Sequence, residues 1–242
     1  VPTEVLAEQH FAKLEALFAD FPVKLGLLTG STTAKKRREM LAELRDGPLN
    51  LIIGTHALIQ KGVDFKALGL VVIDEQHRFG VNQRKILQEK GQKPDLFSMT
   101  ATPIPRTLAI TAYGEMDVST IDELPAGRKP ITTTWLRKNQ VGQVYRLIRS
   151  QVQAGSQVFA ITPLIAESEK VDLQNAEQLF ADMQKAVGDV GQVALLHGKM
   201  KPDEKDQIMR AFSHGDIAVL VSTTVVEVGV DVPNATVMAI FD

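Results

Sequence analysis

Short apolar runs alternate with amphipathic stretches along nearly the whole chain. Runs of four to seven residues rich in Val, Leu and Ile predict strands that are buried on both faces. We expect strands at residues 23–28, 49–55, 70–73, 96–99, 131–136, 157–161, 193–197, 217–222 and 237–240. Apolar positions at helical spacing predict helices at residues 4–18, 35–45, 81–90, 106–113, 141–154, 173–186 and 203–213. This alternation is typical of an α/β fold with mainly parallel sheets flanked by helices.

Residues 122–132 interrupt the alternation with two prolines, a glycine and mixed charges. Such a composition favours an interdomain linker, and the alternative is a long loop within a single domain. We therefore expect two domains, over residues 1–124 and 125–242.

The two halves share one pattern of apolar and small residues. Residues 27–58 align with residues 195–226 without a gap, at an offset of 168 positions (198 − 30). Equivalent pairs at that offset are Gly30 with Gly198, Gly47 with Gly215 and Thr55 with Thr223. Few residues are identical, so the match indicates one strand–turn–helix–strand unit used twice and not a solenoid repeat. Two homologous α/β domains are the simplest interpretation.

Composition narrows the possible functions only modestly. The 242 residues carry a net charge of −2, so the chain is not a broadly basic nucleic-acid coat, and any DNA binding must come from local donors. Cysteine is absent, which excludes disulfides and thiolate metal sites and fits a reducing cytoplasm. We see neither a signal peptide nor an apolar stretch approaching the roughly 20 residues that would span a membrane.

Two adjacent acids, Asp74 and Glu75, end the apolar run at residues 70–73. Ligands of open parallel sheets collect at the carboxyl ends of the strands. An aspartate there is a hard oxygen ligand for the Mg²⁺ of a nucleotide, and the next acid can orient or deprotonate the attacking water. The alternative is a solvated loop after a core strand.

Further polar clusters follow other expected strands. Thr100 and Thr102 would lie beside the two acids, although Thr102 serves equally well as a helix cap. In the second half, Gly229 permits close backbone approach and Asp231 could accept a ribose hydroxyl.

Small-residue turns after strands offer free backbone and hydroxyl donors in both halves. Such donors suit phosphates and carry no base information, so one DNA strand could run across both domains. The alternative, favoured for any single turn, is ordinary turn chemistry. The turn residues are Thr29, Gly30, Ser31, Gly54, Thr55, His56, His197, Gly198, Ser222, Thr223 and Thr224.

Two familiar sites are missing from the sequence. The phosphate-binding pattern G-x-x-x-x-G-K-[ST] does not occur, so no segment here would cradle β- and γ-phosphates. The five histidines show no zinc spacing, and His77 alone is as easily a structural histidine.

Taken together, these segments resemble the superfamily 2 helicases, and most closely the RecG family of branch-migrating DNA helicases. "PTEVLAEQH" from Pro2, including Thr3, is similar to motif Ia, and "LTGS" and "GTHALIQ" to motifs Ib and Ic. "DEQHRFGV" is similar to motif II, "TATPIPRT" to motif III and "STTVVEVGVDVPNAT" to motif V. The transcription-repair coupling factor is the nearest related family, but its motif II usually reads DEEH, so Gln76 favours the RecG family.

The resemblance implies two RecA-like domains that bind ATP with Mg²⁺ between them and grip duplex or branched DNA, such as stalled forks and Holliday junctions. Asp74 would hold Mg²⁺, Glu75 would orient water, and Gly229 and Asp231 would close on the nucleotide. Pro2 and Thr3 would join the DNA-contacting turns. Residues expected to couple the nucleotide state to the DNA are Gln76, His77, Thr100, Thr102 and Arg106.

The sequence departs from the family pattern at both ends. It starts just after the expected place of the P-loop and stops before the arginine-bearing motif VI. We therefore expect a helicase-core fragment with little or no ATPase activity of its own. A non-catalytic nucleic-acid-binding module that lost the P-loop is the alternative, and it would have no need of Asp74 and Glu75.

Overall fold

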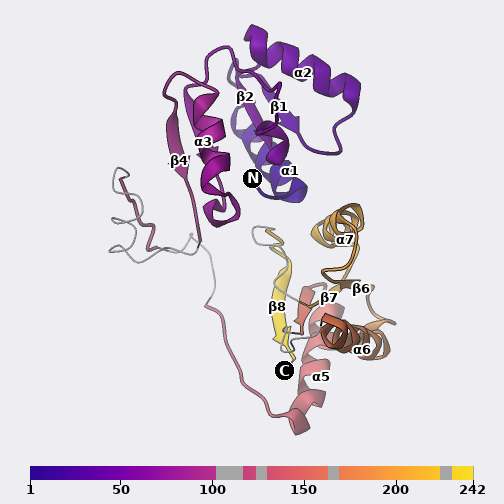
Figure 1. The fold of residues 1–242 in the computed structure, drawn as a ribbon. Coiled ribbons are helices and arrows are strands. Elements are labelled where there is room, and N and C mark those ends of the chain that lie inside the picture. Colours follow the sequence, from indigo (N-terminus) through magenta and orange to yellow (C-terminus); the bar gives the residue numbers. More distant parts are fainter. Residues whose placement is uncertain (102–116, 124–129, 163–168, 224–230, 242) are drawn as a thin grey trace.

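The computed structural model describes residues 1–101, 117–123, 130–162, 169–223 and 231–241, which form two α/β bodies (Figure 1). The predicted helix at 106–113 lies outside these residues, as do Thr102, Arg106, Thr224 and Gly229. No described helix is long and apolar enough to cross a membrane.

The first body is built on two pairs of parallel strands. Strand β1 (Leu25–Leu28) pairs with β2 (Leu51–Gly54), and β3 (Leu70–Ile73) pairs with β4 (Asp95–Ser98). The helices are α1 (Glu4–Leu17), α2 (Ala34–Asp46) and α3 (Val81–Glu89), with short 3₁₀ turns at η1 (His56–Leu58) and η2 (Gln76–Arg78). Every residue of β2 and β3 lines an apolar cavity of about 820 Å³, so the facing edges of these two strands border one hollow.

The second body contains one parallel sheet of four strands in the order β6-β7-β5-β8. These strands are β5 (Gln157–Ile161), β6 (Val193–Leu196), β7 (Val219–Ser222) and β8 (Ala235–Ile240). The helices are α5 (Val141–Gln153), α6 (Glu169–Val187) and α7 (Pro202–His214), and the turn η3 (Lys138–Gln140) precedes α5.

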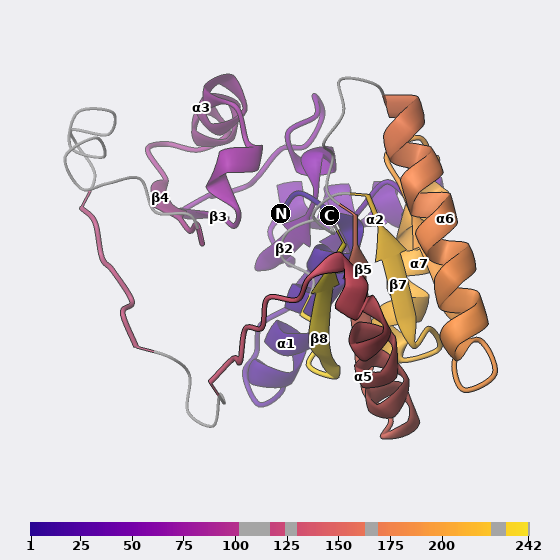
Figure 2. The ribbon, with the colours of Figure 1, turned by 90° about the horizontal axis from the view of Figure 1, so that it is seen from below.

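Helices cover both faces of the four-stranded sheet (Figure 2). Ile148 of α5 and Met183 of α6 are fully buried against Val158 and Val219 in one core cluster. Phe212 of α7 is fully buried with Leu220 in the other. The inner strands β7 and β5 are buried along nearly their whole length, as the sequence pattern indicated, whereas burial alternates along the edge strand β8.

The predicted repeat is confirmed by the element boundaries. Shifting β1, α2 and β2 by 168 positions (193 − 25) gives the bounds of β6, α7 and β7. The strand register is equivalent as well, since Leu25 pairs with Leu51 and Val193 pairs with Val219. Gly47 and Gly215 end the two helices in the left-handed conformation, with φ of 103° and 89°. Both domains therefore contain the same strand–turn–helix–strand unit, with its turns at equivalent positions.

One predicted strand is wrong. Residues 131–136 form no strand, and the side chains of Ile131 and Trp135 are 84% and 81% exposed. The run "ITTTWL" has strong β-propensity, but none of the described strands pairs with it, and β-propensity measures packing more than backbone preference. The other predicted elements within the described residues are present, with ends shifted by at most four residues.

Candidate active site

Asp74 follows β3 directly and makes two contacts through its carboxylate. Its Oδ1 accepts the backbone N–H of Glu75 at 2.9 Å, and its Oδ2 lies 2.8 Å from Nε2 of His10 on α1. Sequence reasoning did not single out His10, because 64 positions separate the two residues and only the fold brings them together. The carboxylate is thus held in one orientation at the carboxyl end of the strand.

Glu75 has a strained backbone and a buried side chain. Its φ of 53° and ψ of 54° are left-handed, a conformation that costs about 1–2 kcal/mol for a residue with a Cβ. The residue is 6% exposed, and its Oε2 has no hydrogen-bond partner. The imidazole Nδ1 of His77 lies 3.4 Å from that oxygen. Strain and an unsatisfied buried oxygen at one residue are typical of functional sites.

Strand β4 brings Thr100 beside the two acids, as the neighbouring strand ends predicted. The N–H of Gln76 donates to Met99 O at 3.0 Å, and the N–H of Met99 donates to Ile73 O at 2.8 Å. These bonds continue the pairing of β3 with β4 past the regular strands. Thr100 therefore emerges next to Asp74 and Glu75, with an exposed side chain.

The turn after β1 is closely organised. Thr29 is buried, and its Oγ1 lies 2.9 Å from Oγ of Ser31. The backbone N–H of Ser31 donates to Oε1 of Glu4 at 3.1 Å. A Cβ on Gly30 would meet that same oxygen at 3.0 Å. The predicted phosphate donor at Ser31 is thus engaged by a carboxylate of α1.

The turn after β2 touches the acid-bearing segment. A Cβ on Gly54 would approach Leu28 O to 2.4 Å, so the close contact of β1 with β2 requires glycine there. The N–H of Thr55 donates to the same Leu28 oxygen at 3.4 Å. The imidazole of His56 stacks on Phe79, with centroids 5.0 Å apart and planes at 13°. Because Phe79 follows η2, this stack joins the second predicted DNA turn to the segment after Glu75.

The corresponding turns of the second domain are more buried than expected. Ser222 and Thr223 are 3% and 5% exposed, so their side chains do not lie on the surface. Gly198 is exposed, and its carbonyl accepts from Nζ of Lys205 at 2.9 Å. His197 is partly exposed, but its Nδ1 is buried without a hydrogen-bond partner.

Asp231, predicted to close on the nucleotide, contacts helix α1 of the first domain. The backbone N–H and carbonyl of Asp231 both bond to the amide of Gln9 at 3.2 Å, and its Oδ2 lies 3.4 Å from Nζ of Lys13. Thr3 caps α1, since its Oγ1 accepts from the N–H of Leu6 at 3.3 Å, and Pro2 is half-buried beside it. The structure therefore places Asp231 against the first domain through α1.

Two family descriptions match successive parts of the chain. "DEAD/DEAH box helicase" matches residues 1–110, and "Helicase conserved C-terminal domain" matches residues 139–242. The fold, the acids after β3 and these matches define a two-domain helicase core.

Relatives over the whole chain identify the family as RecG, and they do not favour the two alternatives raised by the sequence. The chain is 59% identical to "ATP-dependent DNA helicase RecG" of Streptococcus pneumoniae and 54% identical to that of Bacillus subtilis, covering 100% of this chain and 36% of each relative. A structure described as RecG bound to a three-way DNA junction superposes with a TM-score of 0.80 and 42% identity, over 98% of this chain and 30% of that one. The chain thus corresponds to the helicase core of RecG proteins and spans about a third of their length.

Proposed function

We propose that this chain is the motor core of an ATP-driven helicase that remodels branched DNA. The observation that carries the proposal is the pair Asp74 and Glu75 after β3: the carboxylate of Asp74 is oriented by two contacts, and Glu75 has a buried side chain on a strained backbone. Relatives named as ATP-dependent DNA helicases, and one related structure with a three-way DNA junction, support it. We also propose a cytoplasmic location, which the cysteine-free composition supports.

The residues present fit the metal of a nucleotide complex. No group of three or more metal-ligating side chains occurs among the described residues, so this part of the chain offers no closed protein cage. Mg²⁺ is commonly held by one or two carboxylates together with phosphate oxygens and waters, and Asp74 supplies such a carboxylate. When bound, Mg²⁺ neutralises charge on the phosphates.

Glu75 is proposed to orient and activate the water molecule that attacks the nucleotide. Its free Oε2 is a hydrogen-bond acceptor in a site with little solvent, where it can orient a water molecule and accept its proton. The left-handed backbone of Glu75 directs its side chain into the buried site, so we propose that the acceptor is preorganised. His77, 3.4 Å from that oxygen, is proposed to respond to a change there.

The coupling and second-domain roles belong to the same proposal. Gln76 and His77 lead from the acids to Phe79 and its stack with His56, so they connect the nucleotide side to a DNA turn. Thr100 joins them from β4. Thr102 and Arg106 are proposed to extend this connection, and Gly229 and Asp231 to close on the nucleotide.

DNA is proposed to bind along the turns after the strands of both domains, through its backbone. Exposed positions at Gly30, Ser31, His56 and Gly198 support this path. Ser222 and Thr223 would need to become exposed before their hydroxyls reached a phosphate.

Unwinding of a three-way junction tests the substrate. The gene product that carries this chain with its flanking sequence should separate the junction with ATP, and separate a linear duplex of equal length and composition much more slowly. Equal rates on both substrates would remove the preference for branched DNA from the proposal.

A further inference from the structure

Helix α1 belongs to the first domain but packs its first turn into the second. Val5 is 4% exposed and lies in a buried cluster with Leu196, Met209 and Phe212. The helix α7 lies next to the start of α1, where the two bodies meet (Figure 1). The two domains therefore share a small apolar contact at this end of α1.

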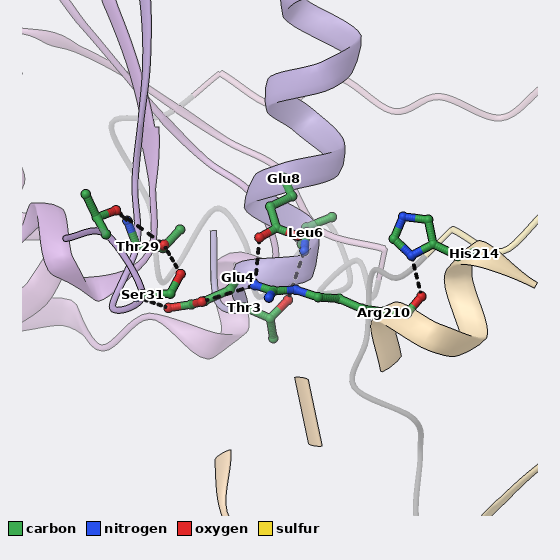
Figure 3. Close-up of polar contacts among 9 residues, drawn as sticks. Thr3, Glu4, Leu6, Glu8, Thr29, Ser31, Arg210 and His214 are labelled. Atoms are coloured by element: carbon green, nitrogen blue, oxygen red, sulfur yellow. Dashed lines mark hydrogen bonds and ion pairs between the residues drawn. The ribbon is translucent and has the colours of Figure 1, made fainter. Parts of the chain in front are cut away.

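Arg210 of α7 adds charged contacts beside this apolar patch (Figure 3). Its Nη2 lies 2.7 Å from Oε1 of Glu8 and 3.5 Å from Oε2 of Glu4. The side chains of Arg210 and Glu4 are 35% and 18% exposed, so solvent screens the interaction less than it screens a surface pair. Both contacts are made by the single nitrogen Nη2, which holds Arg210 of α7 close to the two carboxylates on α1.

Glu4 divides its two oxygens between the domains. Oε2 faces Arg210, while Oε1 accepts the N–H of Ser31 in the turn after β1. The close-up shows this carboxylate between the turn and α7 (Figure 3). A phosphate bound by the Ser31 N–H would have to displace Oε1, and this would change the partner of Arg210.

We propose that Arg210 is a positioning residue that sets the spacing of the two domains, and that Glu4 links this spacing to the turn at Ser31. The role of Arg210 is argued from the contacts alone, whereas the role of Glu4 rests on the proposed DNA-binding function. By linkage, if DNA at the turn changes the equilibrium constant for closing the clamp of Glu4, Glu8 and Arg210 by some factor, then closing the clamp changes DNA affinity by the same factor.

The absence of cysteine from the chain makes the spacing measurable. Spin labels on Glu39→Cys in α2 and Lys185→Cys in α6, both exposed positions, report the distance between the domains by pulsed electron paramagnetic resonance. The otherwise unchanged chain should give one dominant distance. Arg210→Gln should shift or broaden the distribution, whereas Arg146→Gln, at an exposed position on α5, should leave it unchanged.

A charge exchange separates positioning from loss of folding. Glu8→Arg alone and Arg210→Glu alone should each disturb the distance, and the two together should restore it because the pair is re-formed in the opposite sense. An unchanged distribution in Arg210→Gln, or no restoration in the double variant, would overturn the clamp.

A second arm adds a three-way DNA junction to the labelled chain. DNA should shift the distance, and Glu4→Gln should reduce that shift at least twofold while the chain still binds DNA. If DNA binds without moving the labels, the link through Glu4 is wrong. If DNA does not bind at all, the proposed function and the link both fail, while the Arg210 result without DNA still decides the clamp.

Discussion

The imidazole Nε2 of His10 lies 2.8 Å from Oδ2 of Asp74 and fixes the carboxylate from the side of α1. Partners that orient a metal ligand typically change metal affinity or activity about 10–100-fold when removed. In the longer gene product, His10→Ala should therefore raise the Mg²⁺ concentration needed for half-maximal ATP hydrolysis by about tenfold or more. Glu15→Ala, an exposed position on the same helix, is the matched control. An unchanged Mg²⁺ dependence in His10→Ala would show that this contact does not orient the ligand.

A glycine at position 75 should relieve the backbone strain. Glycine adopts the left-handed conformation without the penalty of a Cβ, so the free energy of unfolding of Glu75→Gly should be about 1 kcal/mol higher than that of Glu75→Ala. At ordinary positions the order is reversed. Urea unfolding of the 242-residue chain measures the difference. If the alanine variant were the more stable, residue 75 would not be strained in solution.

Gly54 should not tolerate a larger residue. The Cβ of Gly54→Ala would meet the backbone oxygen of Leu28 at 2.4 Å, so the strands must move apart. Overpacking of this kind costs about 1–3 kcal/mol of unfolding free energy. Gly69→Ala is the control, because its Cβ meets nothing within 4 Å. Equal unfolding free energies for the two variants would argue against the close approach of β1 and β2.

DNA affinity should depend strongly on salt and hardly at all on base sequence. The proposed donors reach phosphates, whose neutralisation releases counterions, and log K then falls linearly with log salt. Titrations of junctions with different sequences at several salt concentrations provide the measurement. A strong preference for one sequence would point to contacts with base edges instead.

Local patterning predicted the repeat to the residue, because strand β1 and helix α2 are built by short-range periodicity and a glycine end at Gly47. The acids at 74 and 75 could be located for the same reason, since they break an apolar run. The prediction of a strand at 131–136 is wrong because β-propensity is local, whereas strand pairing depends on residues distant in the sequence.

Contacts between residues far apart in the chain could not be predicted from the sequence. His10 meets Asp74 over 64 positions, and Arg210 meets Glu8 over 202. No periodicity encodes such pairs, because the packing of α1 between two bodies determines them. The left-handed backbone of Glu75 was equally hidden, since neither glycine nor asparagine marks it.

The most direct test of the central claim is DNA-stimulated ATP hydrolysis by the gene product that carries this chain with its flanking sequence. We predict steady turnover that branched DNA stimulates, and Glu75→Gln should lower it by about 10²–10⁴-fold while nucleotide binding persists. The 242-residue chain alone, which lacks the phosphate-binding loop, should show little or no turnover. Normal turnover in Glu75→Gln, or no hydrolysis by the longer protein, would contradict the assignment of Asp74 and Glu75 to a phosphoryl-transfer site.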